Sequence, residues 1–144
     1  MRMDSGIYRH NLVVAPQAID GNGHVNNVEY LRWMQDAALG HSDSLGLTSA
    51  TLAAGGRWVI RSHRIEYLRP AFAGEEVSVL TWISNVRRVQ SLRKYRIIHS
   101  VSQAVLAEAE TDWIFTDAQT GRLRSIPGAV ASLFTPVPQG EEPK

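Results

Sequence analysis

The residue types best suited to chemistry are gathered in one short stretch, Asp20-Gly21-Asn22-Gly23-His24-Val25-Asn26-Asn27. It holds a carboxylate, an imidazole and three carboxamides beside two glycines, and few purely structural loops need so many functional groups. A carboxylate or an imidazole can activate a water molecule, and a carboxylate can also attack an electrophile directly. The segment that follows has helical periodicity, and the positive end of a helix stabilises a developing anion. The stretch therefore predicts a site that activates a nucleophile and holds an anionic intermediate.

A long helix is predicted directly after this stretch. Apolar residues recur mostly at steps of three and four, the helical period, at Val28, Leu31, Met34, Ala38 and Leu45. Asn26 followed by Glu29 resembles a capping box, and Gly46 is a suitable residue to end the helix. A second stripe on the same segment comprises Tyr30, Trp33, Ala37 and His41. A helix that is apolar on more than one face is expected to be enclosed by the rest of the domain.

The rest of the chain is predicted to be mainly strands. Runs rich in β-branched and aromatic residues lie at 8–14, 58–68, 76–85, 92–102 and 104–116. A short final strand is expected near 122–126 and a brief helix from Pro127, whereas residues 135–144 are expected to be flexible. One helix between one early strand and a run of four predicts an α+β fold, in which a mostly antiparallel sheet wraps around that helix.

The composition is that of one ordinary globular domain. The chain has 144 residues, of which 44% are hydrophobic and 20% charged, and its core is expected at about 8–134. A net charge of +1 without a basic, aromatic-rich block gives no reason to expect nucleic-acid binding. The lack of cysteine excludes disulfides, thiolate metal sites and a cysteine nucleophile. No membrane span or signal peptide is evident in the sequence, so a cytoplasmic location is expected.

Other catalytic classes lack their sequence signatures. There is no Gly-x-Ser-x-Gly elbow of the α/β-hydrolases. The five histidines include no His-Glu-x-x-His pair, so neither a metal ion nor a cofactor is predicted. Gly21 and Gly23 lack the third glycine and the following strand–helix–strand pattern of a dinucleotide-binding loop.

The order of the predicted elements, together with the polar stretch, resembles the hotdog-fold acyl thioesterases. In this fold one long helix is wrapped by an antiparallel sheet. Residues 20–27 with Tyr30 are similar to the D-x-N-x-H-V-N-N-x-x-Y motif of the acyl-carrier-protein thioesterase branch. The segment Glu66-Tyr67-Leu68-Arg69-Pro70, with Gly74 after it, resembles the strand end and turn that come next in many members. The resemblance spans residues 8–126.

A second likeness is to the 4-hydroxybenzoyl-CoA thioesterase branch. Arg87, Arg88 and Ser91 lie where that branch carries basic residues near the nucleotide of CoA. Members typically form homodimers, sometimes assembled into homotetramers, with active sites between subunits. The resemblance therefore implies that Asp20 of one chain works beside Gly56 or strand residues of a partner chain.

The resemblance implies hydrolysis of an acyl thioester carried by CoA or by acyl-carrier protein. Asp20 would be the general base or the nucleophile, with Asn22 and His24 assisting it. Backbone N–H groups of residues 27–29 are candidate donors to the oxyanion, and by resemblance so is that of Gly56. Four residues are candidates for substrate binding: Asn27, Tyr30, Arg87 and Arg88. A non-catalytic domain that binds or senses acyl thioesters is the alternative function.

Each candidate also has a structural interpretation. Asp20 and Asn22 could make the side-chain hydrogen bonds of an Asx-turn, and His24 could be a structural histidine. Asn26 is favoured as the helix cap over a catalytic group. Tyr30 and Trp33 are favoured as packing residues. The cations Arg87, Arg88, Arg93 and Lys94 could equally form an ordinary solvated surface. Plant enzymes carry a further acidic residue at the position of Pro70, and Glu66 is the carboxylate near it in this sequence.

Overall fold

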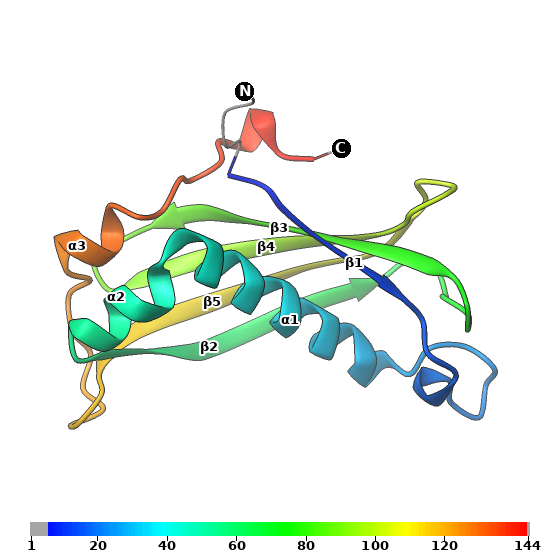
Figure 1. The fold of residues 1–144 in the computed structure, drawn as a ribbon, viewed down its shortest axis with the longest axis horizontal. Helices are drawn as coiled ribbons and strands as arrows, with labels where there is room; N and C mark the ends of the chain where they lie inside the picture. The colour runs from blue at the N-terminus through cyan, green and yellow to red at the C-terminus, as the bar shows by residue number, and fades with distance from the viewer. Residues whose placement is uncertain (1–5, 144) are drawn as a thin grey trace.

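Five antiparallel strands form one sheet, and the long helix α1 lies against one face of it (Figure 1). The strand order is β1-β3-β4-β5-β2, so the first two strands of the chain form the two edges. The computed structural model describes residues 6–143. Its elements are β1 (Tyr8–Val13), η1 (Pro16–Ala18), α1 (Asn27–Leu45), α2 (Leu47–Ala53), β2 (Gly56–Tyr67), β3 (Glu76–Val86), β4 (Gln90–His99), β5 (Val105–Asp117), α3 (Gly128–Ala131) and η2 (Gln139–Glu141).

This architecture confirms the predicted α+β hotdog fold, with an antiparallel sheet around one long helix. Helix α1 begins at Asn27 and ends before Gly46, as the apolar spacing predicted. The five predicted strands all form, and their ends lie within three residues of the predicted bounds. The brief helix after Pro127 is also present.

Two segments differ from the sequence prediction. Residues 47–53 form the helix α2, which was not predicted, and which buries Leu47 and Thr51. Residues 122–126 do not form a strand, since Leu123 makes only an isolated bridge to Thr116. Strand β4 pairs with β5 only as far as Ile114, so only the short end of β5 beyond Ile114 is left unpaired on that side. This end is too short for residues 122–126 to pair with it as a strand.

The C-terminal segment, expected to be flexible, packs against the sheet where the structure describes it. Val137 is 2% exposed, and its N–H donates to the carbonyl oxygen of Ile83 at 2.9 Å. Strand β1 begins at Tyr8, opposite Thr81, so the edge of β3 is open at Ile83 and accepts this segment. Glu142 then forms an ion pair with Lys94 at 3.0 Å on the face of the sheet that is turned away from α1.

The two faces of the sheet differ in chemistry. The face towards α1 buries apolar side chains, among them Val77 and Val79 of β3 and Ile97 of β4, and the helix contributes Met34 and Ala37 to the same core. The opposite face carries cross-strand ion pairs, Arg64 with Glu110 at 3.1 Å and Arg96 with Glu108 at 2.6 Å. Truncating one buried aliphatic side chain to alanine costs about 2–5 kcal/mol, so each packing contact in this layer contributes substantially to stability. These contacts hold α1 in one position against the sheet.

Asn26 caps α1, as the sequence predicted. Its Oδ1 accepts a hydrogen bond from the N–H of Val28 at 3.0 Å. The reciprocal half of a capping box is missing, because the N–H of Asn26 donates to Ala18 and Glu29 pairs with Arg32 at 3.5 Å. The cap therefore depends on one side chain.

We expect Asn26→Ala to lower the free energy of unfolding by about 1 kcal/mol, because it removes the acceptor of an N-terminal N–H group. Asn26→Ser keeps an acceptor at the cap and is expected to remain close to wild type. Urea unfolding followed by circular dichroism measures both. Equal stability of the alanine variant and the wild type would show that the cap contributes nothing.

Candidate active site

The polar stretch folds into a tight loop directly before α1. Ile19 and Val25 form an isolated antiparallel bridge at its base. Inside the bridge the N–H of Asp20 donates to the carbonyl oxygen of His24 at 3.0 Å, and the N–H of Gly23 donates to that of Asp20 at 3.1 Å. Gly23 has a φ of 85°, a conformation that side-chain-bearing residues rarely adopt. The backbone of the loop is therefore defined by its own hydrogen bonds.

The carboxylate of Asp20 is half-buried and uses one oxygen in this loop. Its Oδ1 accepts the N–H of Asn22 at 2.8 Å, which is the Asx-turn of the structural interpretation. Within residues 6–143 this is the one hydrogen bond of the Asp20 side chain. The turn holds the carboxylate in place while the second oxygen stays available, so the structural and chemical interpretations are compatible.

Asn22 and His24 lie on the same loop but are not linked to Asp20 through their side chains. Asn22 is exposed, and the His24 ring is edge-on to Phe72, with ring centroids 6.5 Å apart. Among the described residues, no hydrogen bond joins the side chains of these three polar residues. The loop brings them together along the chain without forming a hydrogen-bonded triad.

The start of α1 offers one open backbone donor. The N–H of Val28 is bound by Asn26 Oδ1, and the N–H of Glu29 donates to the carbonyl oxygen of Asn26 at 2.9 Å. The N–H of Asn27, the first residue of α1, makes no hydrogen bond within the part of the chain that the structure describes. Of the three oxyanion donors predicted at the helix start, residues 27–29, Asn27 is thus the one whose N–H is still available for an anion.

Two tyrosines surround this helix start. The hydroxyl of Tyr67, at the end of β2, donates to the carbonyl oxygen of Asn27 at 3.2 Å, and burial raises its pKa, which favours the donor form. Tyr30 is 2% exposed and packs against Trp33 and Tyr67 at centroid distances of 5.0 and 5.1 Å. In one chain Tyr30 is therefore a packing residue, and its contact with substrate stays a prediction.

Three predicted site residues lie at the other end of the sheet (Figure 1). Gly56 begins β2, whose far end at Tyr67 contacts Asn27, and a strand of this length spans about 35 Å. Arg87 and Arg88 lie in the turn between β3 and β4 at the same end as Gly56. One chain therefore does not bring Asp20 and these residues together.

The packing around Gly56 supplies a structural reason for a glycine there. A Cβ at this position would fall 2.7 Å from Cε2 of Phe115, whose side chain is fully buried. The glycine is thus required by the ring against it, and a role of its N–H in catalysis stays a prediction.

The strand before the loop at 68–75 does not supply a second carboxylate beside Asp20. Glu66 is opposite Glu108 in the register and lines a groove with Lys94 on the face turned away from α1. Its neighbours Ile65 and Tyr67 occupy the alternate positions, on the helix side. Glu66, the carboxylate near Pro70 in the sequence, therefore lies on the face of the sheet turned away from α1 and does not replace the acidic residue of the plant enzymes.

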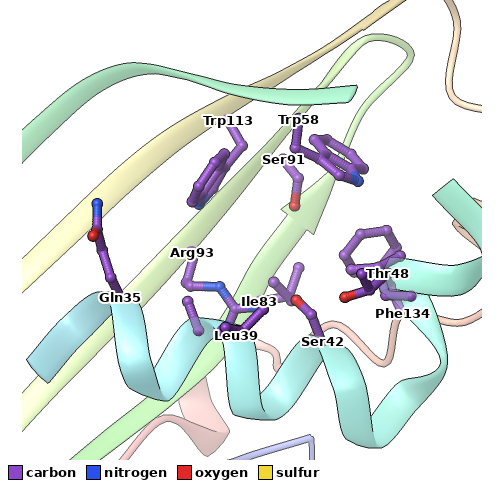
Figure 2. A pocket seen from close by; sticks show the side chains of 12 residues that line it. Gln35, Leu39, Ser42, Thr48, Trp58, Ile83, Ser91, Arg93, Trp113 and Phe134 are labelled. Atoms are coloured by element: carbon purple, nitrogen blue, oxygen red, sulfur yellow. The ribbon is translucent and has the colours of Figure 1, made fainter. Parts of the chain in front are cut away.

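Sequence reasoning missed a cavity between α1 and the sheet, shown in Figure 2. It has a volume of about 280 Å³, and Arg93 lines it together with Trp58, Trp113 and Phe134. Arg93 had been grouped with surface cations, yet it is 3% exposed. The strand period of two could have revealed that Arg93 is buried, because it lies on the same face of β4 as Tyr95 and Ile97, which are also buried.

No group of three or more His, Asp or Glu side chains among residues 6–143 is arranged to hold a metal ion. In the same part of the chain, no helix is both long and apolar enough to span a membrane.

The sheet, the central helix and the loop before it define a hotdog protein of the thioesterase type. The chain belongs to the thioesterase-like superfamily, whose family model matches residues 14–134. No curated protein sequence matches the chain.

Several solved structures share this fold at low sequence identity. Slr0204, a 1,4-dihydroxy-2-naphthoyl-CoA thioesterase from Synechocystis, is 19% identical, with a TM-score of 0.79 over 89% of this chain and 95% of that one. SAV2348 from Staphylococcus aureus, solved in complex with CoA, is 16% identical, with a TM-score of 0.82 over 92% of this chain and 84% of that one. The 12:0-ACP thioesterase from Umbellularia californica is 20% identical, with a TM-score of 0.81 over 96% of this chain but 55% of that one. At these identities the likeness shows the fold alone.

We expect Gly56→Ala to lower the free energy of unfolding by about 1–3 kcal/mol, because the new methyl group overlaps a buried ring. Phe115→Leu in the same chain should recover part of that loss, since it removes the overlapping ring atoms. Urea denaturation of the single and double variants measures the coupling. If the two changes were simply additive, the packing explanation for Gly56 would be wrong.

Proposed function

We propose that this protein hydrolyses an acyl thioester of CoA or of acyl-carrier protein, with Asp20 as the residue that activates or supplies the nucleophile. The observation that carries the proposal is a half-buried carboxylate, with one oxygen uncommitted, in the loop that leads into a helix whose first N–H is open. Membership of the thioesterase-like superfamily supports the same chemistry.

Two routes are open to Asp20. As a general base, the carboxylate takes a proton from water, and the oxygen of that water attacks the thioester carbonyl. As a nucleophile, a carboxylate oxygen attacks first and forms a mixed anhydride, which water then cleaves. In both routes the carbonyl oxygen becomes an oxyanion that the N–H of Asn27 can bind. The C–S bond then breaks, and the thiolate leaves and takes up a proton.

The neighbouring polar groups have supporting roles in this proposal. His24 can donate a hydrogen bond to the leaving sulfur or relay its proton, and the exposed amide of Asn22 can hold water. Arg87 and Arg88 are exposed cations that suit the phosphates of CoA or of a phosphopantetheine arm. The complex of SAV2348 with CoA supports a CoA carrier for a protein of this fold.

The proposed active unit is a homodimer in which β2 pairs with β2 of a second copy. Strand β2 forms an edge of the sheet, and an open edge invites pairing. Antiparallel pairing over the full strand around a twofold axis sets Gly56 of one copy beside Tyr67 of the other, which is the tyrosine that contacts Asn27. The exposed Val59 at one end of β2 and the exposed Leu68 beyond the other end would also be covered. Further pairing of dimers into a tetramer is compatible with this arrangement.

A non-catalytic acyl-thioester binding domain is the alternative. Such a domain needs the fold and a cavity but has no need for an uncommitted carboxylate in the loop that leads to an open helix N–H. The two functions differ in turnover and agree in binding, so the decisive variant removes the charge of Asp20 without breaking its loop.

We expect Asp20→Asn to lower kcat/KM for acyl-CoA hydrolysis by about 10²–10⁴-fold, the usual contribution of a catalytic base. The asparagine oxygen can still accept the N–H of Asn22, so the fold and the binding of acyl-CoA should be unchanged. Turnover is followed by thiol release and binding by isothermal titration calorimetry. Binding without turnover in the wild-type protein would favour the alternative function instead.

We expect Val59→Lys to convert the protein to monomers with little activity, because the proposed pairing sets the new lysine of one copy opposite Arg64 of the other and the like charges repel each other. Val101→Lys is the matched control, since Val101 is 79% exposed in the turn between β4 and β5, away from β2. Sedimentation velocity and thiol release are measured on both variants. A fully active monomer would show that one chain contains a complete site.

A further inference from the structure

The cavity between α1 and the sheet has rigid aromatic walls. The indole N–H of Trp58 donates to Thr51 Oγ1 at 3.1 Å, and its ring packs edge-on against Phe115 and Phe134 at 5.0 and 5.9 Å. Trp113 stands on the neighbouring strand β5, as Figure 2 shows. Walls of this kind suit the apolar body of a small ligand. The volume of about 280 Å³ lies near the lower limit of small-molecule sites, roughly 300–1,000 Å³.

One wall of this apolar cavity carries a buried cation. The side chain of Arg93 runs from β4 towards α1, next to Leu39 and Ile83 (Figure 2). It is 3% exposed, and burial lowers the pKa of its guanidinium, although arginine stays charged at neutral pH. Within residues 6–143 no carboxylate forms an ion pair with it.

The hydrogen bonds of Arg93 occupy only one of its nitrogens. Nη1 donates to Thr81 Oγ1 and to His41 Nδ1, both at 3.0 Å. Thr81 in turn donates to the carbonyl oxygen of Lys94 at 2.9 Å, which orients its lone pair towards Arg93. Since a guanidinium has donors only, His41 Nδ1 is the acceptor in this contact. Among the described residues, Nε and Nη2 of Arg93 have no hydrogen-bond partner, and together they form the edge that binds a carboxylate in a bidentate way.

We infer that this cavity binds the acyl part of the substrate and that Arg93 recognises a second carboxylate at the far end of that acyl group. The substrates are then thioesters of short dicarboxylic acids, with an apolar segment between the thioester and the free carboxylate. The aromatic walls hold that segment, and the carboxylate neutralises the buried guanidinium. A purely apolar acyl group would cover the guanidinium without giving it an anionic partner, which is unfavourable.

This inference rests on the proposed function, because it names the substrate class of the same site. In one chain the cavity lies along the C-terminal half of α1 and is remote from Asp20, which precedes the first turn. The twofold pairing of β2 removes this separation, since it sets the Gly56 end of one copy beside the helix start of the other. The acyl group would then enter the cavity of one subunit while its thioester meets Asp20 of the second.

The test compares pairs of acyl-CoA thioesters of equal chain length that differ in their terminal group. Glutaryl-, adipyl- and pimelyl-CoA end in a carboxylate, and pentanoyl-, hexanoyl- and heptanoyl-CoA end in a methyl group. We expect the wild-type protein to prefer at least one dicarboxylic member by about tenfold or more in kcat/KM, because a polar site rejects an analogue that leaves it unpaired. 5-Hydroxypentanoyl-CoA is included, and equal preference for it would overturn the assignment of a carboxylate.

Arg93→Gln should abolish this preference, since it removes the charge but keeps amide donors for Thr81 and His41. Lys94→Met removes the adjacent cation from the opposite face and should keep the preference. If the Arg93 variant does not fold, the wild-type comparison alone decides, because equal kcat/KM within all three pairs overturns the inference while leaving the proposed function intact.

A binding measurement separates the two hypotheses further. Calorimetry of the same thioesters with Asp20→Asn needs no turnover. A tenfold tighter binding of a dicarboxylic thioester without hydrolysis by the wild-type protein would support the cavity assignment and refute the hydrolase. Equal binding within every pair would refute the cavity assignment.

Discussion

The burial of α1 against a single curved sheet is the constraint on which the other features depend. The sheet has one apolar face, and the helix is the element that covers it, so residues such as Met34 and Ala37 on the helix and Val79 on β3 are fully enclosed. Once the helix is fixed there, its first turn, the loop before it and the cavity along its second half are fixed as well. The candidate site follows from this packing rather than from the loop alone.

The same geometry distributes the chemistry over the two ends of one helix. The carboxylate of Asp20 and the open N–H of Asn27 lie at its start, whereas the cavity and Arg93 lie along its C-terminal half. A single layer of sheet also leaves β2 as an open edge that runs between these two ends. Antiparallel pairing of two such edges exchanges the ends, so a twofold dimer can bring together what one chain keeps apart.

Polar groups inside the helix–sheet layer show where the chain departs from simple core packing. Thr81, Arg93 and His41 form a connected set of hydrogen bonds between β3, β4 and α1. Apolar side chains of similar volume would fill this region without the desolvation of a charge. The retention of a cation there is understandable if the layer has to bind a ligand as well as to hold the helix.

Much of the fold was predictable because its signals are local. The helical spacing from Val28 onwards, the cap at Asn26 and the alternation in the strands each depend on neighbouring residues, and all are present in the structure. The helix α2 was missed because its few residues carry no clear period, and the packing of Val137 was missed because it depends on where β1 begins beside β3.

The sequence by itself determined the fold class and the composition of the loop, since both are written in short-range pattern and residue type. The tertiary structure decided which of the chemically capable residues lie together. It left Asp20 with one uncommitted oxygen, turned Glu66 to the opposite face, set Gly56 against a ring and buried Arg93 in a cavity. The physical reason is that strand register and helix packing join residues far apart in the chain, and no local pattern contains that information.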